Sequence, residues 1–262
     1  MISVENITKS TKDGRQILKG ISFKAKKGDF IGILGPSGAG KTLTMRCING
    51  LTKPTTGKII IDIDGEKHDI TKYKGKKMRF MHQKIGVVFQ GFNLVKRLSV
   101  LENVIIGKLG QINQFRSLFL GFNDKEFEKA LEVLKKVKIS KLANREVSSL
   151  SGGEMQRVAI ARAIFQEPVI LLADEPIANL DPSNAKKIMK WLKPLSKEMP
   201  VIGVFHQPEI ASKCCNRIIA LKDGKIFYDG NSDISESMLE EIYGDQLQEI
   251  ENQTSQIASV TL

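Results

Sequence analysis

The stretch that decides the fold of this 262-residue chain is the apolar run Phe30–Leu34 followed by a loop of Gly35, Pro36, Ser37, Gly38, Ala39, Gly40, Lys41 and Thr42. The run predicts a buried strand, the loop matches the pattern G-x-x-x-x-G-K-[ST], and a helix should begin at Lys41 and end near Asn49-Gly50. Such a loop surrounds a phosphate chain with backbone N–H groups. Lys41 can then reach the β- and γ-phosphates, and the Thr42 hydroxyl can ligate Mg²⁺. The stretch therefore predicts a nucleotide-phosphate site.

A second apolar run, Val169–Ala173, is followed by two acids, Asp174 and Glu175. A parallel strand at this point would bring Asp174 to the edge of the sheet where the glycine-rich loop lies, and its carboxylate could support the Mg²⁺ shell. Glu175 would then face an attacking water and is the candidate general base. An apolar run before Asp-Glu is common on its own, but beside the loop it indicates nucleotide hydrolysis.

The rest of the chain favours an α/β fold. Strands are predicted at Ile2–Ile7, Ile21–Phe23, Lys58–Asp62, Ile85–Phe89 and Val201–Phe205, and helices between Val100 and Lys141. We predict a P-loop NTPase (RecA-like) parallel-sheet core, with a helical subdomain inserted at about 91–161 and an N-terminal antiparallel β subdomain. Turns are expected at Asp223-Gly224 and Asp229-Gly230, and a short helix near 234–243. The domain is expected to span 1–246, with a tail at 247–262.

The charge is distributed unevenly. Residues 1–230 contain all 40 Lys and Arg and 22 of the 29 acids, a net charge of +18, while residues 231–262 contain seven acids and no Lys or Arg. The densest basic run, Lys67–Lys84, includes only Tyr73 and Phe80 as aromatic residues, so we expect no nucleic-acid partner. A solvated basic face near a membrane surface is the preferred interpretation.

The three cysteines lack the spacing of a disulfide framework, which favours a reducing compartment. Cys214 and Cys215 are expected to be buried thiols rather than a redox pair. The first residues lack a basic region followed by an apolar core, and no apolar stretch approaches the ~20 residues that cross a bilayer. Neither a signal peptide nor a membrane-spanning helix is therefore expected.

Beyond the loop, further motifs resemble those of one family, the ABC ATPases. Ser151, Gly152, Gly153 and Glu154, continuing to Arg157, resemble the family signature and lie 23 residues before Asp174, as in that family. The resemblance extends over nearly the whole chain, because three more positions match in the expected order. Gln90 resembles the Q-loop glutamine, Asn179-Leu180-Asp181-Pro182 the D-loop, and His206 the switch histidine.

The resemblance implies an ATP hydrolase that works as a homodimer. In this family the signature lies on the helical insert and contacts the γ-phosphate bound by the opposite subunit. The nucleotide would be bound by the loop residues 35–42 with Gln90, the signature residues 151–154 and Asp181. The resemblance further implies that Thr42, Gln90 and Asp174 hold Mg²⁺, and that Glu175, His206 and Lys41 are catalytic. Asp181 would link the two sites of the dimer.

Two positions depart from the family pattern. Glu154 replaces a glutamine that is more common after Ser-Gly-Gly, which places a negative charge near the ATP site. Thr11 occupies the position of the early aromatic residue that stacks on adenine, with Lys9 and Lys12 beside it. Adenine stacking is therefore not expected from this position.

The sequence after the Q-loop resembles that of the phosphonate importer ATPases. The similar segments are Phe92–Val104, Gly107–Gly110 and Arg116–Phe119, in the region that touches the permease in this family. The resemblance implies a motor subunit for uptake of phosphonate-type compounds, with integral membrane permease subunits and a separate substrate-binding protein. Its place would be peripheral, at the cytoplasmic face of the cell (inner) membrane. Phosphite or a phosphate ester would suit the same motor.

Two other classes fit less well. A nucleic-acid- or ribosome-acting ABC ATPase would need a long coiled coil or a second cassette, and only the basic core favours it. A small-molecule kinase built on the glycine-rich loop would leave Leu150–Gln156 and His206 without a role.

Overall fold

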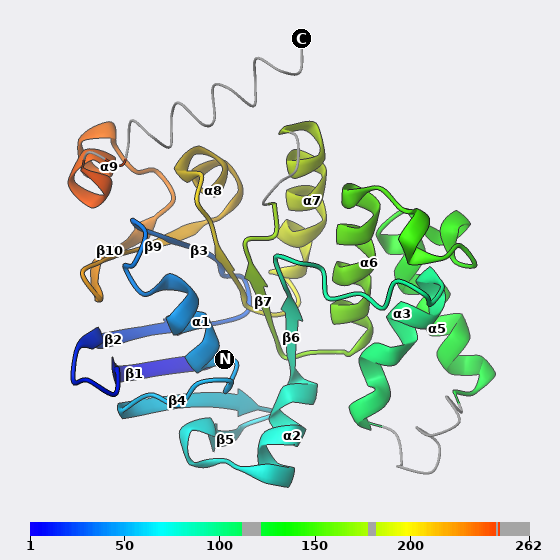
Figure 1. Cartoon of the computed structure of the whole chain (residues 1–262), viewed down its shortest axis with the longest axis horizontal. Helices are drawn as coiled ribbons and strands as arrows, with labels where there is room; N and C mark the ends of the chain where they lie inside the picture. The colour runs from blue at the N-terminus through cyan, green and yellow to red at the C-terminus, as the bar shows by residue number, and fades with distance from the viewer. Residues whose placement is uncertain (112–121, 178–181, 245, 247–262) are drawn as a thin grey trace.

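The computed structural model describes residues 1–111, 122–177, 182–244 and 246, and it contains two β-sheets and a group of helices beside them (Figure 1). In chain order the elements are β1 (Ile2–Ser10), β2 (Gln16–Ala25), β3 (Phe30–Leu34), α1 (Lys41–Ile48), β4 (Thr56–Ile63), β5 (Glu66–Asp69), the 3-10 helix η1 (Ile70–Lys72), α2 (Gly75–Lys84), β6 (Ile85–Val88), α3 (Val100–Ile105), η2 (Ile106–Gln111), α5 (Asp124–Lys136), η3 (Ser140–Leu142), η4 (Val147–Ser149), α6 (Gly152–Phe165), β7 (Ile170–Asp174), α7 (Pro182–Leu195), β8 (Val201–Val204), α8 (Pro208–Cys214), β9 (Arg217–Lys222), β10 (Lys225–Asn231) and α9 (Glu236–Tyr243).

The larger sheet has the strand order β10-β9-β3-β8-β7-β6, and all neighbours are parallel except the hairpin β9-β10. Its central strands are buried on both faces, as continuous apolar runs predict. In β3, Ile31 and Ile33 join the hydrophobic cluster on one side of the sheet, and Phe30 and Leu34 join the cluster on the other. This alternation places the sheet between two cores, and the predicted parallel-sheet α/β fold is confirmed.

The smaller sheet is antiparallel, with the order β2-β1-β4-β5. Its inner face shares a cluster with α1, through Met45, Cys47 and Ile48, and with one face of the parallel sheet. Helix α1 therefore lies between the two sheets. This position of α1 also fixes the position of the glycine-rich loop that precedes it. The predicted N-terminal antiparallel β part is confirmed.

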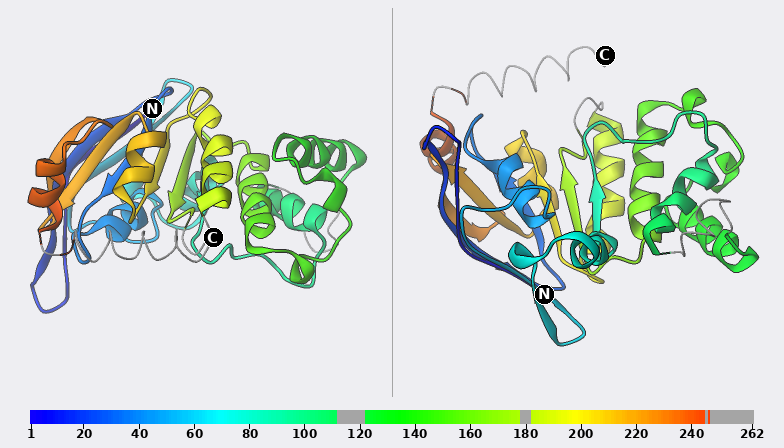
Figure 2. Two further views of the ribbon diagram at one scale, coloured as in Figure 1. Left: turned by 90° about the horizontal axis from the view of Figure 1, so that it is seen from above. Right: turned by 60° about the horizontal axis from the view of Figure 1, so that its bottom comes forward.

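On the other side of the parallel sheet, α3, α5 and α6 form a helical part beside the edge strand β6 (Figure 2). Helix α6 continues to Phe165, four residues beyond the predicted end of the insert near 161, and its buried face joins the core of the sheet. One helix thus belongs to both parts, because α6 contacts α3 and α5 as well as β6.

Three local features differ from the sequence-based expectation. Asp229-Gly230 is not a turn but part of β10, where the Asp229 carboxylate accepts two hydrogen bonds of 2.7 Å from the Arg217 guanidinium of β9. Helix α2 was not predicted, because its sequence is too charged to show a clear apolar period. The Cys214 thiol at the end of α8 is only half-buried, while Cys215 is buried as predicted.

Candidate functional site

The candidate site residues come together because four neighbouring parallel strands end at the same edge of the sheet. The glycine-rich loop follows β3, Gln90 follows β6, Asp174 ends β7, and His206 follows β8. The order β3-β8-β7-β6 makes these strand ends adjacent. Ligands of open α/β sheets bind at the carboxyl ends of the strands, so this edge is the expected place for the chemistry.

The loop between β3 and α1 requires glycine at specific positions. Gly35 has φ 139°, and a Cβ atom there would lie 2.1 Å from the carbonyl oxygen of Leu221. Gly40, the N-cap of α1, has φ 100°, and a Cβ atom there would lie 2.5 Å from Leu18. Both positions combine a left-handed backbone with a close neighbour, so a side chain would distort the loop.

A cavity of about 290 Å³ lies over this loop. It is lined by residues of the loop and of α1 together with two residues that follow β7 and β8, namely Ser37, Gly38, Ala39, Gly40, Lys41, Thr42, Leu43, Glu175 and His206. Helix α1 begins here without a side-chain cap and without an acid in its first turn. Its first N–H groups have no partner within the helix, so the cavity can accept an anion.

The buried Lys41 side chain folds back onto its own loop. Its Nζ donates hydrogen bonds to the carbonyl oxygens of Gly35 (2.6 Å) and Pro36 (3.0 Å). Burial lowers the pKa of Lys41, and the nearby Glu175 carboxylate opposes that shift. An anion in the cavity would offer this ammonium group a better partner than the two neutral carbonyls.

Two further contacts to the loop come from the end of the described chain. The Gly35 N–H donates to the Tyr243 hydroxyl oxygen of α9 (3.1 Å), and the Ser37 N–H donates to the Gln246 side-chain carbonyl (3.2 Å). Burial raises the pKa of Tyr243 to about 12. Sequence reasoning missed both partners, because they lie more than 200 residues after the loop and no local pattern indicates the contact.

Glu175 is the centre of a hydrogen-bonded group. Its Oε1 is 2.6 Å from His206 Nε2, and its Oε2 accepts a hydrogen bond of 2.6 Å from Gln90 Nε2. The Glu175 side chain is 16% exposed and that of His206 is 50% exposed. Glu175 also has φ 50°, an uncommon backbone conformation for a non-glycine residue. The structure therefore brings together three residues that the sequence assigned to three separate motifs.

Asp174 differs from its neighbour in having no partner for one oxygen. Its Oδ1 is buried without a hydrogen bond, and burial together with the Glu175 charge raises the pKa of Asp174. An orphaned carboxylate oxygen fits a site that completes its contacts by binding a cation. Mg²⁺ usually takes only one or two protein oxygens besides phosphate and water, and the exposed Thr42, which lines the same cavity as Glu175, the residue after Asp174, suits that pattern. The residues present therefore fit Mg²⁺.

The signature residues form the beginning of α6. Ser151 is the N-cap, and its hydroxyl accepts a hydrogen bond from the Glu154 N–H. The Glu154 carboxylate in turn accepts from the Ser151 N–H and hydroxyl, both at 2.9 Å, and these bonds lower the pKa of Glu154. Glu154 thus completes a capping box, a role that glutamate and glutamine both perform. The capping box therefore explains why glutamate can replace glutamine at position 154.

Gly152 and Gly153 form the first turn of α6, and a Cβ atom on Gly153 would lie 3.3 Å from the Asn184 side chain of α7. None of residues 151–154 lines the cavity over the glycine-rich loop. Thr11 lies in the turn between β1 and β2, where its N–H and hydroxyl both donate to the Arg15 carbonyl, and it does not line the cavity either. Asp181 and the rest of 178–181 lie outside the described residues.

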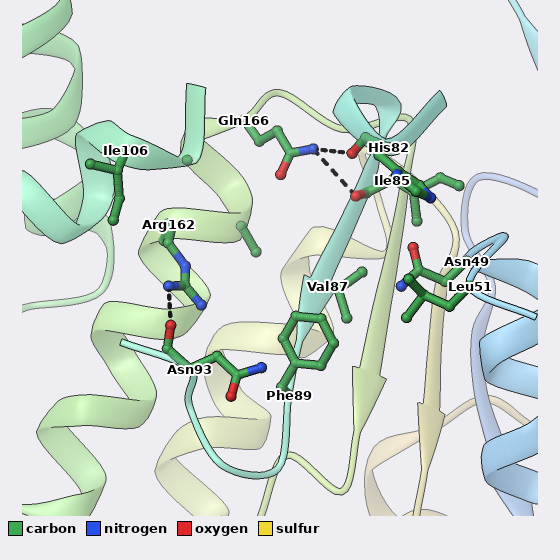
Figure 3. Close-up of a pocket in the computed structure, with 12 residues that line it drawn as sticks. Asn49, Leu51, His82, Ile85, Val87, Phe89, Asn93, Ile106, Arg162 and Gln166 are labelled. Carbon is green, nitrogen blue, oxygen red and sulfur yellow. Dashed lines mark hydrogen bonds between the residues drawn. The ribbon is translucent and has the colours of Figure 1, made fainter. Parts of the chain in front are cut away.

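A second cavity, of about 430 Å³, lies between the core and the helical part (Figure 3). Leu51, Val87 and Phe89 line its core side, and Ile106 and Arg162 line its helical side. The Arg162 guanidinium donates to the carbonyl oxygens of Phe92 (2.9 Å) and Asn93 (2.6 Å), just after Gln90. Arg162 thereby connects helix α6 to this loop, a link that its place in a helix did not reveal from sequence.

Comparison with known proteins agrees with this geometry. A family model described as ABC transporter matches residues 18–178. This chain belongs to the ABC transporter family. The family predicted from the motifs is therefore confirmed, as is the fold.

Close relatives are similar over nearly their whole length. The Phosphonates import ATP-binding protein PhnC of Treponema denticola is 43% identical over 235 residues, which cover 89% of this chain and 90% of that protein. The protein of the same name from Lactobacillus delbrueckii subsp. bulgaricus is 43% identical, with 93% and 94% covered.

Solved structures show the same architecture. The dimeric post-hydrolysis state of the ATP-binding cassette MJ0796 bound to ADP and Pi has a TM-score of 0.73 and 36% identity, covering 90% of this chain and 100% of that one. The ADP conformation of the cassette MJ1267 has a TM-score of 0.77 and 27% identity, with 95% and 97% covered. Within the described residues, no helix is both long and apolar enough to span a bilayer.

Proposed function

We propose that this chain is the ATP-hydrolysing motor subunit of an importer for phosphonate-type compounds. One observation carries the proposal: the cavity over the glycine-rich loop is lined by Glu175 and His206, in a chain that matches phosphonate import ATP-binding proteins along most of its length. The chain would act as a homodimer with integral membrane permease subunits and a separate substrate-binding protein. Its place is peripheral, at the cytoplasmic face of the cell (inner) membrane.

In this proposal the triphosphate occupies the cavity, with the loop residues 35–42 around it. Lys41 gives up its two carbonyl partners and binds the β- and γ-phosphate oxygens instead. Its present hydrogen bonds to both loop carbonyls support this exchange, because they hold the ammonium group at the loop that would surround the phosphates. Asp174, Thr42 and Gln90 are the residues that would hold Mg²⁺. When bound, that ion neutralises charge that develops on the phosphates during transfer.

Glu175 is the proposed general base. Its carboxylate is oriented from two sides by Gln90 and His206 and needs no long movement to contact a water beside the γ-phosphate. His206, half-exposed at the cavity, would contact the γ-phosphate and respond to its loss. Because Glu175 and His206 are hydrogen-bonded to each other, release of phosphate and rearrangement of Glu175 are expected to be coupled.

The dimer follows from the place of the signature. The N-terminus of α6 is an anion site of small residues, yet it does not line the cavity of its own chain. We therefore assign Ser151, Gly152, Gly153 and Glu154 to the nucleotide bound by the second subunit, with Asp181 linking the two sites. The dimeric form of the similar cassette MJ0796 supports this arrangement.

The permease is proposed to insert into the cavity between core and helical part (Figure 3). Its lining combines apolar side chains, such as Leu51, Val87 and Ile106, with polar ones, such as His82 and Gln166, which suits a short segment of a partner. Arg162 connects its wall to the loop after Gln90, so a partner seated there would act on the residues that orient Glu175.

The test is uptake of a labelled phosphonate in cells that lack this gene, complemented with wild type or with Glu175→Gln. Uptake restored by wild type alone would establish the cargo class and the motor role together. Equal uptake in all strains would contradict the phosphonate assignment, and labelled phosphite and phosphate esters would then identify the cargo within the same class of transporter.

A further inference from the structure

Helix α2 and the turn before it present a group of exposed basic side chains, which we name the α2 basic face: Lys72, Lys74, Lys76, Lys77 and Arg79. From Ile70 to Leu101 the sequence contains eight Lys and Arg and no acid. Among the described residues, the only ion pair of this face joins Lys72 to Asp69, at 3.4 Å. Four of its five charges are therefore uncompensated.

Aromatic rings lie beside Lys77 of this face and beside Lys84 at the end of α2. Phe80 is 41% exposed, an unusual fraction for so large an apolar side chain, and Lys84 Nζ lies 5.8 Å from its ring centre. Lys77 Nζ lies 5.7 Å from the centre of the Tyr73 ring. An exposed ring among lysines is the composition of a surface that meets lipid headgroups, because the ring enters the interface while the charges contact phosphates.

The position of α2 indicates what it faces. The same helix supplies His82, and the strand after it Ile85, to the lining of the cavity that we assign to the permease (Figure 3). In the right view of Figure 2, where the bottom of the molecule in Figure 1 comes forward, α2 lies at the front beside the helical part. This step rests on the proposed function: if an integral membrane permease enters that cavity, the adjoining α2 basic face is close to the bilayer.

We propose that the α2 basic face binds the anionic headgroups of the membrane next to the permease. The inner surface of a membrane carries negative potential, and each nearby Lys or Arg strengthens binding about fivefold. The attraction acts on the isolated chain as well as on the assembled transporter. It would orient the cassette with the permease cavity toward the membrane before the permease is engaged.

Nucleic acid fits this surface less well. Base stacking needs open aromatic faces, and of the two rings available only that of Phe80 is exposed. The Tyr73 ring is half-buried beneath Lys77, and its hydroxyl is 3.0 Å from His68 Nδ1. A charged surface with one apolar ring matches headgroups better than a stacked strand.

The experiment measures co-sedimentation of the full-length purified chain with permease-free vesicles. One set contains phosphatidylglycerol and phosphatidylcholine in equal parts, and the other phosphatidylcholine alone. The test variant is Lys76→Gln/Lys77→Gln/Arg79→Gln. The control is Lys186→Gln/Lys187→Gln/Lys190→Gln, which removes the same charge from exposed positions of α7, away from α2 (Figure 1). Glutamine keeps the helix propensity of lysine, so neither helix should be disturbed.

We expect wild type and the α7 variant to sediment with the anionic vesicles and the α2 variant to bind at least roughly tenfold more weakly. Binding should fall as salt is raised and be absent with phosphatidylcholine alone. Equal weakening in both variants would overturn the proposal, because net charge alone would then explain binding. The proposal would also be overturned if the chain bound no vesicles but bound RNA or DNA in a salt-sensitive way, and if only the α2 variant lost that binding.

The ATPase rate of each variant, measured without vesicles, separates this proposal from the proposed function. We expect both variants to hydrolyse ATP at the wild-type rate, since none of the six residues lines the cavity over the glycine-rich loop. Normal hydrolysis with no vesicle binding would overturn the α2 proposal alone. An inactive wild type that still binds vesicles would instead contradict the motor role.

Discussion

At the scale of single residues, two adjacent acids have opposite environments. Glu175 has hydrogen-bond partners on both oxygens, whereas Asp174 has a buried oxygen with none. The sequence predicted both as site residues from an apolar strand followed by two acids. The sequence did not predict which of the two acids has hydrogen-bond partners. The partners of Glu175 are Gln90 and His206, which follow other strands, so no local pattern indicates them.

Asp174→Asn should stabilise the ligand-free protein while reducing hydrolysis. Burial raises the pKa of Asp174, so the folded protein binds a proton more readily than the unfolded chain, and the cost of its charge is present at neutral pH and relieved as the pH falls. Thermal unfolding without nucleotide should show a gain of about 1 kcal/mol at neutral pH. The gain should shrink in acid, where the wild-type carboxyl is protonated.

The exposed Asp233→Asn is the matched control for this change and should leave stability unaltered. If Asp174→Asn were destabilising at neutral pH, the oxygen would have a partner after all, and its assignment to a cation site would lose its support.

At the scale of elements, α6 carries the signature at its N-terminus, and at its other end the C-cap residue Gln166 donates a hydrogen bond to the Ile85 carbonyl oxygen of β6. The sequence contains the capping-box pattern, Ser151 followed three residues later by Glu154, but the family resemblance assigned both residues to nucleotide binding. The link of α6 to the loop after Gln90 was not readable, because the two acceptors are backbone carbonyls about seventy residues earlier, at Phe92 and Asn93.

Glu154→Gln should keep both the cap and the ATPase rate, and Glu154→Ala should cost about 1 kcal/mol of stability. The hydrogen bonds from Ser151 lower the pKa of Glu154, so the stabilisation is present above the ordinary glutamate pKa and is lost as the pH falls. Urea unfolding at neutral and acidic pH measures both effects. A difference between Ala and wild type that stays constant with pH would argue against the charged cap.

Arg162→Met should cost about 2 kcal/mol, because it leaves two carbonyl oxygens without their charged donor. Arg162→Lys should lose less, since it keeps the charge but not the fork geometry. Arg157→Met, on the same helix, removes a contact of 5.2 Å with the Trp191 ring and a charge near Glu154, but no hydrogen-bond donor to a loop carbonyl, and should cost under about 1 kcal/mol. Equal losses at 157 and 162, measured by urea unfolding, would contradict the link between α6 and the loop.

At the scale of the whole molecule, most of the parallel sheet could be predicted, including its edge strand β6, whereas β10 at the other edge was misread. Strands β3, β6, β7 and β8 are apolar runs followed by site residues, so their existence and role were predicted from sequence, whereas their order in the sheet is seen only in the structure. Strand β10 was misread at Asp229-Gly230, because the ion pair between Asp229 and Arg217 depends on the register of the hairpin. The contact of Tyr243 with Gly35 depends on how the chain ends pack, which no local pattern encodes.

We expect two copies of this chain to bind ATP between them and to separate after hydrolysis. The most direct measurement is light scattering of Glu175→Gln with and without ATP, beside Lys41→Ala. Glu175→Gln should lose hydrolysis by at least roughly a hundredfold and form an ATP-dependent dimer, because the base is removed while the phosphate contacts remain. Lys41→Ala should stay monomeric, since it lacks the phosphate contact. A Glu175→Gln protein that stays monomeric in ATP would contradict the ATP-bound dimer, and one that hydrolyses ATP at the wild-type rate would contradict the role of Glu175 as general base.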